Sequence, residues 1–288
     1  MRTIIDFHVH PYLTEEENLC MYREDFSLTA QEAVLDIKNA GISHICGSVL
    51  CKQKFEPHKG FEHLRELNRE ALKIRELYPD FYTPGFHIHP GYIKESLEEI
   101  EYMHARKVKL IGELVPYMHG WRESGYDYGC GELSELLDLA GKYGMIVSFH
   151  TMTEQQDEME RMIAAHPDVI FVAAHPGQKG DYLKHLERLL KYENAYLDIS
   201  GTGLFRYGML AAGVKRVGAE KILFGTDYPI TNPSMYVQAV LGEHISEEDR
   251  EKIFYRNAGR ILEIEQGKIE DSREGRNEIL GVWPAGGQ

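Results

Sequence analysis

The feature that most constrains the fold is a regular alternation of short apolar runs with amphipathic segments. Eight apolar runs predict β-strands, at residues 4–10, 42–50, 82–89, 108–115, 145–149, 169–174, 195–199 and 221–224. The segments between and after them have helical spacing, at residues 29–41, 61–77, 93–105, 132–143, 154–165, 182–191, 204–213 and 247–262. Most strand runs are apolar throughout, which is typical of parallel strands buried on both faces. Eight βα units predict an α/β fold, the (β/α)8 TIM barrel.

An open doubly wound sheet is the alternative arrangement of the same elements. The barrel is favoured because histidines and carboxylates recur at the carboxyl ends of the strands, and only a barrel brings those ends to one common mouth. We therefore expect residues 1–265 to form one catalytic barrel. Residues 266–288 are polar and rich in glycine, and we expect this tail to pack on the barrel or on a partner subunit.

Charge and composition exclude several classes of partner. The formal net charge is -14, from 32 basic and 46 acidic residues, which disfavours a broad nucleic-acid or anionic-membrane surface. No apolar run approaches the roughly 20 residues that span a bilayer. The four cysteines form no Cys-x-x-Cys pair, as expected for reduced thiols in the cytoplasm. We expect a cytoplasmic protein with a small-molecule substrate, either as a monomer or as a homodimer.

The first apolar run contains two histidines one residue apart, His8 and His10. Alternate residues of a strand project from one face, so the two rings are expected on the same side, about 6–7 Å apart at the backbone. Pro11 cannot continue the ladder, and the strand is therefore expected to end just past His10. Two histidines at the carboxyl end of a buried strand are close enough to bind one ion.

Similar residues follow four of the other strands. They are Glu113, His150, His175 and Asp227, each next to Pro, Gly, Thr or Leu where an apolar run ends. Each one alone has an ordinary explanation, such as a surface hydrogen bond, an ion pair or a turn. Together they form the nitrogen and oxygen ligand set that suits zinc and similar divalent ions. We therefore expect these side chains to meet at a metal site.

Five stretches of the sequence resemble a known family. They are residues 5–11 (IDFHVHP), His150, residues 174–177 (AHPG), residues 224–229 (FGTDYP) and residues 253–262 (IFYRNAGRIL). In this order they are similar to the amidohydrolase superfamily, in particular to its amidohydrolase-related (amidohydrolase 2) branch of metal-dependent hydrolases. The resemblance extends over residues 2–264, and it implies a (β/α)8 barrel with a catalytic divalent metal.

The resemblance also implies roles for individual residues. His8, His10, His150 and Asp227 become metal ligands. His175 becomes either a ligand of a second metal or the acid or base beside a single metal. Glu113 resembles the glutamate that bridges two metals in some binuclear members, which favours two ions over one. Zinc is the expected ion, with manganese, iron and magnesium as alternatives.

The expected reaction is hydrolysis of an amide, ester or lactone bond in a small molecule. Asp227 would take a proton from a metal-activated water and return it to the leaving group. The side chains expected to contact the substrate are His89, Tyr117, Trp121, Arg122 and Arg206.

Three other functions remain open. A metal-dependent decarboxylase or hydratase of an acidic, ring-derived substrate would need one metal and a cation such as Arg122 or Arg206 on the substrate carboxylate. Glu113 also fits a binuclear phosphodiesterase. The last alternative is a barrel that binds metal without turnover, in which Asp227 would have no purpose.

Overall fold

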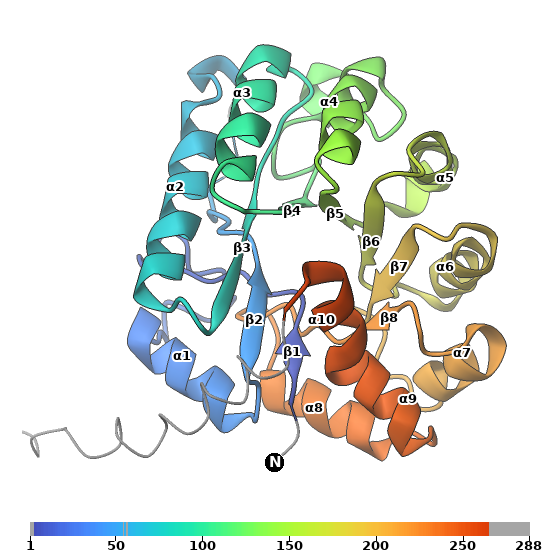
Figure 1. The fold of residues 1–288 in the computed structure, drawn as a ribbon. Coiled ribbons are helices and arrows are strands. Elements are labelled where there is room, and N and C mark those ends of the chain that lie inside the picture. Colours follow the sequence, from blue (N-terminus) through green and yellow to red (C-terminus); the bar gives the residue numbers. More distant parts are fainter. Residues whose placement is uncertain (1–2, 54, 56, 265–288) are drawn as a thin grey trace, which may run out of the picture.

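The computed structural model describes residues 3–53, 55 and 57–264 and contains one sheet of eight parallel strands in the order β1 to β8 (Figure 1). The predicted (β/α)8 TIM barrel is therefore confirmed. The strands are β1 Ile5–Asp6, β2 His44–Gly47, β3 Tyr82–Phe86, β4 Leu110–Leu114, β5 Ile146–His150, β6 Ile170–Ala174, β7 Ala195–Asp198 and β8 Ile222–Leu223.

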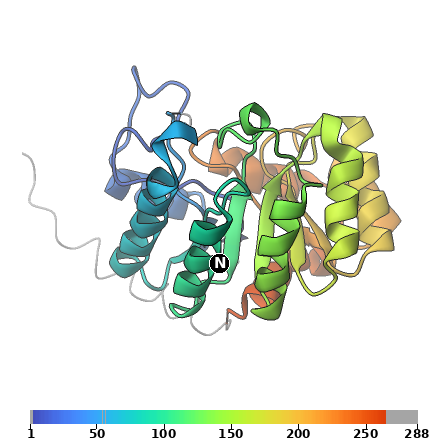
Figure 2. The ribbon, with the colours of Figure 1, turned by 90° about the horizontal axis from the view of Figure 1, so that it is seen from above.

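Helices surround the strands on the outside (Figure 2). The α-helices are α1 Ala30–Asn39, α2 Glu62–Leu77, α3 Ile93–His104, α4 Gly131–Lys142, α5 Gln156–Ala165, α6 Lys179–Lys191, α7 Met209–Val217, α8 Pro233–Gly242, α9 Glu247–Glu251 and α10 Asn257–Leu262. Among the described residues, three short 3-10 helices are η1 Pro57–Lys59, η2 Arg122–Ser124 and η3 Thr153–Gln155. In the part of the chain that the structure describes, no helix has both the length and the apolar character needed to cross a bilayer.

The last third of the chain differs from the predicted helices. The sequence pattern predicts one helix over 247–262, whereas the structure has α9, a π-helical segment η4 at Lys252–Arg256 and then α10. Helix α8 was missed, although its start carries a recognisable signal. Asn232 accepts a hydrogen bond from the backbone of Met235, and Pro233 occupies the first turn, where a missing N–H costs nothing.

The ring of strands is closed by backbone hydrogen bonds beyond the ends of β1 and β8. Phe7 N donates to Phe224 O at 2.9 Å, and His10 N donates to Tyr228 O at 2.8 Å. Asp227 N donates to His8 O at 2.8 Å. The regular strand β1 ends at Asp6, so the strand predicted over 4–10 is too long. The histidines lie instead in an extended segment that still pairs with its neighbour.

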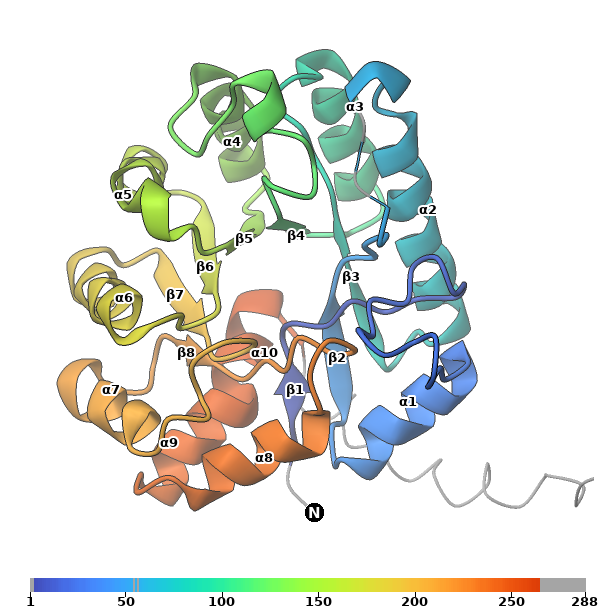
Figure 3. The same cartoon turned by 180° about the vertical axis from the view of Figure 1, so that it is seen from behind.

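The interior of the barrel is packed at one end. An inner apolar cluster takes side chains from seven of the strands and from α10, which lies beside β1 and β8 (Figure 3). Its buried members are Ile5, Phe7, Cys46, Leu110, Ile146, Val172, Tyr196, Leu223, Ala258 and Ile261. Because this end is filled, the carboxyl ends of the strands are the end left for a site. The predicted tail, 266–288, lies outside the described residues.

Candidate metal centre

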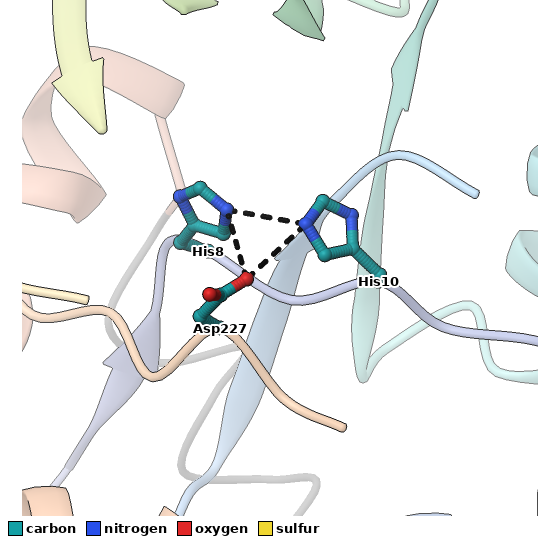
Figure 4. Close-up of side chains that lie close together, drawn as sticks. All are labelled: His8, His10 and Asp227. Atoms are coloured by element: carbon teal, nitrogen blue, oxygen red, sulfur yellow. Dashed lines mark hydrogen bonds and ion pairs between the residues drawn. The ribbon is translucent and has the colours of Figure 1, made fainter. Parts of the chain in front are cut away.

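Three ligand-type side chains converge where the segments after β1 and β8 pair. His8 Nε2 and His10 Nε2 are 3.3 Å apart (Figure 4). Asp227 Oδ1 lies 3.6 Å from the first of these nitrogens and 3.4 Å from the second. All three side chains are buried. The backbone pairing of the two segments thus brings the N-terminus and residue 227 together in one group.

A second group comes from the ends of three neighbouring strands. Glu113 lies on β4, His150 ends β5 and His175 follows β6. Glu113 Oε1 is 2.9 Å from His150 Nδ1 and 3.5 Å from His175 Nε2. The three ligand atoms all lie within 4.8 Å of one another, which is close enough to surround one ion.

Glu113 connects the two groups. Its Oε1 atom faces His150 and His175, whereas its Oε2 atom lies 3.6 Å from both His8 Nε2 and His10 Nε2. One carboxylate therefore presents a different oxygen to each group. The structure brings together all six residues that the sequence suggested as ligands.

The hydrogen bonds of the ring nitrogens test whether the first group suits a cation. His10 Nδ1 is 3.0 Å from Ser48 O, and His8 Nδ1 is 2.9 Å from Asp198 Oδ2. A carbonyl and an ionised carboxylate only accept, so each ring holds a proton on Nδ1. In the neutral rings both Nε2 atoms then carry lone pairs, which face each other and the Asp227 carboxylate. Such a set fits a divalent ion and leaves it no competing donor.

The charges at the centre also favour a bound cation. Burial lowers the pKa of His8, but Asp198 and Glu113 outweigh it and hold the pKa well above its usual value. His175 behaves alike: burial lowers its pKa, and Asp227 and Glu113 raise it overall. The buried carboxylates therefore stabilise a positive charge at the centre. In the metal-free protein that charge is carried by protonated histidines, and a bound divalent ion would replace it.

Two of the converging residues have an unusual backbone. His175 and Asp227 adopt φ values of 72° and 69°, in the left-handed region that side chains with a Cβ rarely occupy. Such conformations typically cost about 1–3 kcal/mol and occur preferentially at functional sites.

Two buried carboxylates behind the ligands were missed in the sequence. Asp198 ends β7 and bonds His8, as described above. Asp6 accepts hydrogen bonds from His8 N at 3.1 Å and from Thr226 Oγ1 at 2.6 Å, which joins the first strand to the segment after the last. Burial raises the pKa of Asp6 to about 7, although these hydrogen bonds lower it. Asp198 had a detectable signal in the sequence, because it is a carboxylate near the end of the predicted strand 195–199, as the proposed ligands are at the ends of other strands.

Of the predicted substrate contacts, Tyr117 lies closest to the ligands. Its ring centroid is 5.1 Å from that of His150, and it is 38% exposed. Burial, together with Glu113 and Asp227, raises the pKa of Tyr117 to about 12. The phenol therefore stays protonated beside the centre and faces both ligands and solvent.

The two predicted arginines make other contacts. Arg122 forms an ion pair with Glu154. Arg206 donates to Gly177 O at 3.1 Å and to Gln178 Oε1 at 2.5 Å, which links it to the loop that follows β6. Neither guanidinium contacts the ligand groups among the contacts of the described residues.

His89 and Trp121 make contacts with residues other than the six ligand-type side chains. Both are buried, and His89 uses both ring nitrogens: Nε2 donates to His119 O at 2.9 Å, and Nδ1 accepts from Gly91 N at 2.9 Å. The Trp121 ring packs 6.0 Å from the His89 ring. These side chains pack against each other and the neighbouring backbone, and their predicted contact with the substrate stays a prediction.

A model of one protein family matches residues 5–264, almost the whole described chain, and that family is described as amidohydrolase. The chain belongs to the amidohydrolase family. The resemblance seen in the sequence is thereby confirmed. The protein is a TIM barrel of an enzyme family, and its ligand-type residues lie at the carboxyl ends of the strands.

Similar individual proteins are decarboxylases. The gamma-resorcylate decarboxylase of a Polaromonas species is 38% identical over 72 residues, which are 25% of this amidohydrolase-family chain and only 22% of that relative. A solved 2,6-dihydroxybenzoate decarboxylase, complexed with 2,6-dihydroxybenzoate, has a TM-score of 0.70 at 16% identity and covers 92% of this chain and 100% of its own. A dihydroxybenzoic acid decarboxylase from Polaromonas, with bound manganese and the inhibitor 2-nitroresorcinol, has a TM-score of 0.67 at 15% identity over 93% of this chain and 99% of its own. At these identities the solved structures establish the shared fold.

Proposed function

We propose that this amidohydrolase-family protein is a metal-dependent hydrolase that binds two divalent ions and cleaves an amide, ester or lactone bond in a small molecule. The observation that carries the proposal is the position of Glu113. Its two oxygens face two separate groups, His8 with His10 and His150 with His175. A carboxylate shared in this way is suited to hold two ions at the short separation that two-metal hydrolases use.

The first ion would be held by His8, His10 and Asp227, and the second by His150 and His175, with Glu113 between them. Imidazole nitrogens and carboxylate oxygens suit zinc and manganese. We propose zinc as the native ion. Manganese is the alternative, since it is bound in the Polaromonas decarboxylase of the same fold. Bound ions would supply an activated water and polarise the scissile bond.

The roles of the protein's own residues follow from their contacts. Asp227 would accept a proton during attack and return it to the leaving group, because its carboxylate lies beside His8 and His10, where the first ion would be held. Asp198 and Ser48 keep His8 and His10 in the tautomer that leaves Nε2 free. Tyr117 would donate a hydrogen bond from its phenolic hydroxyl to the substrate.

A decarboxylase is the second candidate. The comparisons with known proteins favour it, since the named relatives and fold neighbours decarboxylate hydroxybenzoates. The ligand geometry favours the hydrolase, because a second group of ligands is not needed for a reaction at one ion. The cation expected for a substrate carboxylate is also engaged elsewhere, as Arg122 pairs with Glu154 and Arg206 with Gln178.

Product analysis separates the two candidates. The full chain, loaded with zinc or manganese, would be given a panel of amides, esters and lactones and a panel of hydroxybenzoates. We expect acid release from the first panel and no carbon dioxide from the second. The Asp227→Asn variant should lose at least about 100-fold in kcat, while Asp181→Asn, a carboxylate on α6, should keep it. Carbon dioxide release with no hydrolysis would overturn the proposal in favour of the decarboxylase.

A further inference from the structure

A serine and an aspartate at the end of β7 lie behind both ligand groups. Asp198 and Ser200 are fully buried. Asp198 Oδ2 lies 2.9 Å from His8 Nδ1, and Ser200 Oγ lies 3.0 Å from His175 Nδ1. His8 belongs to the first group and His175 to the second. This pair of residues therefore contacts one histidine of each.

The direction of each hydrogen bond can be worked out. The Ser200 hydroxyl donates to Asp198 Oδ1, so its oxygen is left to accept the proton of His175 Nδ1. Asp198 Oδ1 also receives Ser200 N at 3.0 Å and His175 N at 3.4 Å. Both histidines thus hold a proton on Nδ1 and present Nε2 to the centre.

Asp198 is itself close enough to His8 and His175 to be considered a metal ligand. Its oxygens are already occupied, however: Oδ2 faces an imidazole N–H, and Oδ1 faces two N–H groups and a hydroxyl. Donors on every side exclude a cation from these positions. The carboxylate acts on the histidines instead.

Close packing holds this arrangement in place. A Cβ added at Gly225 would lie 2.9 Å from His8 Cβ and 3.3 Å from Asp198 Oδ1. A Cβ added at Gly201, where φ is +56°, would overlap the His175 ring. The two rings and the carboxylate therefore have little room to move independently of one another.

We propose that Asp198 is a positioning residue that, through Ser200, couples the two ion sites, so that loading of one ion favours loading of the other. An ion on His8 fixes that ring against Asp198, the carboxylate fixes the Ser200 hydroxyl, and the hydroxyl fixes His175 for the second ion. The coupling rests on the two-ion site of the proposed function. Couplings of this kind typically amount to about 5- to 150-fold in affinity.

The test is a titration of the metal-free full chain with Co²⁺, in which binding is measured by calorimetry and by the visible absorption of the bound ion. We expect the wild type to bind two ions with positive cooperativity. Ser200→Ala should weaken only the second ion, by about 10- to 100-fold, and Asp198→Asn should weaken both by a similar factor. Ser134→Ala is the matched control, because Ser134 Oγ lies 3.0 Å from His166 Nε2, away from the centre. It should bind both ions as the wild type does.

A second readout needs no metal. In ¹⁵N spectra of the metal-free protein, Ser200→Ala should disturb the Nδ1–H signal of His175 alone, and Asp198→Asn that of His8 as well. Ions that bind the wild type independently, or variants with unchanged affinities and unchanged signals, would overturn the inference. A protein that loads two ions cooperatively but hydrolyses nothing would keep the coupling and refute the hydrolase. A protein that hydrolyses its substrate but binds the two ions independently would refute the coupling and keep the hydrolase.

Discussion

The barrel contains two His-x-His motifs in comparable positions, and they have different environments. His8 and His10 follow β1, and His87 and His89 follow β3; all four are buried. In the first motif the Nε2 atoms face each other and two carboxylates. In the second, His87 Nε2 donates to Val49 O at 2.7 Å, and both nitrogens of His89 bond backbone groups. One motif is arranged to bind a cation, and the other holds loops together.

The pKa of His8 moves in the opposite direction to the pKa values of the second motif. Asp198 and Glu113 overcome burial and raise the pKa of His8 well above its usual value. Burial lowers the pKa of His87 and of His89 to about 4, with backbone carbonyls as their main partners. Neighbouring carboxylates and a free Nε2, rather than the motif itself, therefore distinguish a metal site from a structural histidine pair.

The largest expected effect comes from removing the carboxylate that makes the first motif different. Glu113→Gln removes one charge and replaces a ligand oxygen by a donor that faces the histidines. We expect bound metal to fall from two ions per chain to one or none, and kcat/KM to fall by more than about 100-fold. Elemental analysis of the purified variant measures the first, and steady-state kinetics the second. Retention of two ions at wild-type activity would contradict this.

A smaller effect concerns the buried neutral histidines. His44, like His89, has a pKa lowered to about 4 by burial. The unfolded chain takes up these protons near pH 6.5, so between pH 6.5 and about 4 it binds more protons than the folded chain. The free energy of unfolding of the metal-free protein should therefore fall by a few kcal/mol as the pH is lowered through that window.

Urea unfolding at a series of pH values measures this dependence. His44→Gln should flatten the slope between pH 6.5 and 4. Equal slopes for His44→Gln and the wild type would show that His44 stays charged when buried.

Substitution in the second motif should affect stability alone. His89→Asn leaves His119 O and Gly91 N without their ring partners, and a lost buried hydrogen-bond partner costs about 1–3 kcal/mol. We expect this loss in urea unfolding, with two ions still bound by elemental analysis. Loss of metal from this variant would erase the distinction between the motifs.

The smallest expected effect lies at the edge of the first motif's site. Tyr117→Phe removes one hydroxyl beside His150 and keeps the ring. We expect KM to rise by about 5-fold, near the worth of one neutral hydrogen bond, with metal content and stability unchanged. An unchanged KM would mean that the phenol does not contact the substrate.

The sequence allowed the fold and all six converging side chains to be predicted, because the relevant signals are local. An apolar run followed by a polar residue and a glycine, proline or threonine marks the end of a buried strand, and the barrel brings such ends together. His150 and His175 were found in this way. The same reasoning predicted a β1 that is too long. The regular strand has only two residues, and the segment beyond it is held by separate backbone hydrogen bonds to its neighbour.

The remaining parts depended on side-chain directions that no local pattern encodes. Ser48 O holds His10 by a backbone carbonyl, which any residue type would supply. His89 ends the predicted strand 82–89 and Trp121 lies in the segment after the next strand, and the direction in which their rings point is decided by tertiary contacts. Asp198 was within reach of sequence reasoning, because it is a carboxylate near the end of the predicted strand 195–199.

The most direct test of the two-ion centre is a crystal structure of the metal-loaded protein with anomalous diffraction at the metal's absorption edge. We predict two peaks on opposite sides of the Glu113 carboxylate, one among His8, His10 and Asp227 and the other beside His150 and His175. A single peak, with Glu113 unbound, would contradict the two-ion hydrolase and support a one-ion decarboxylase.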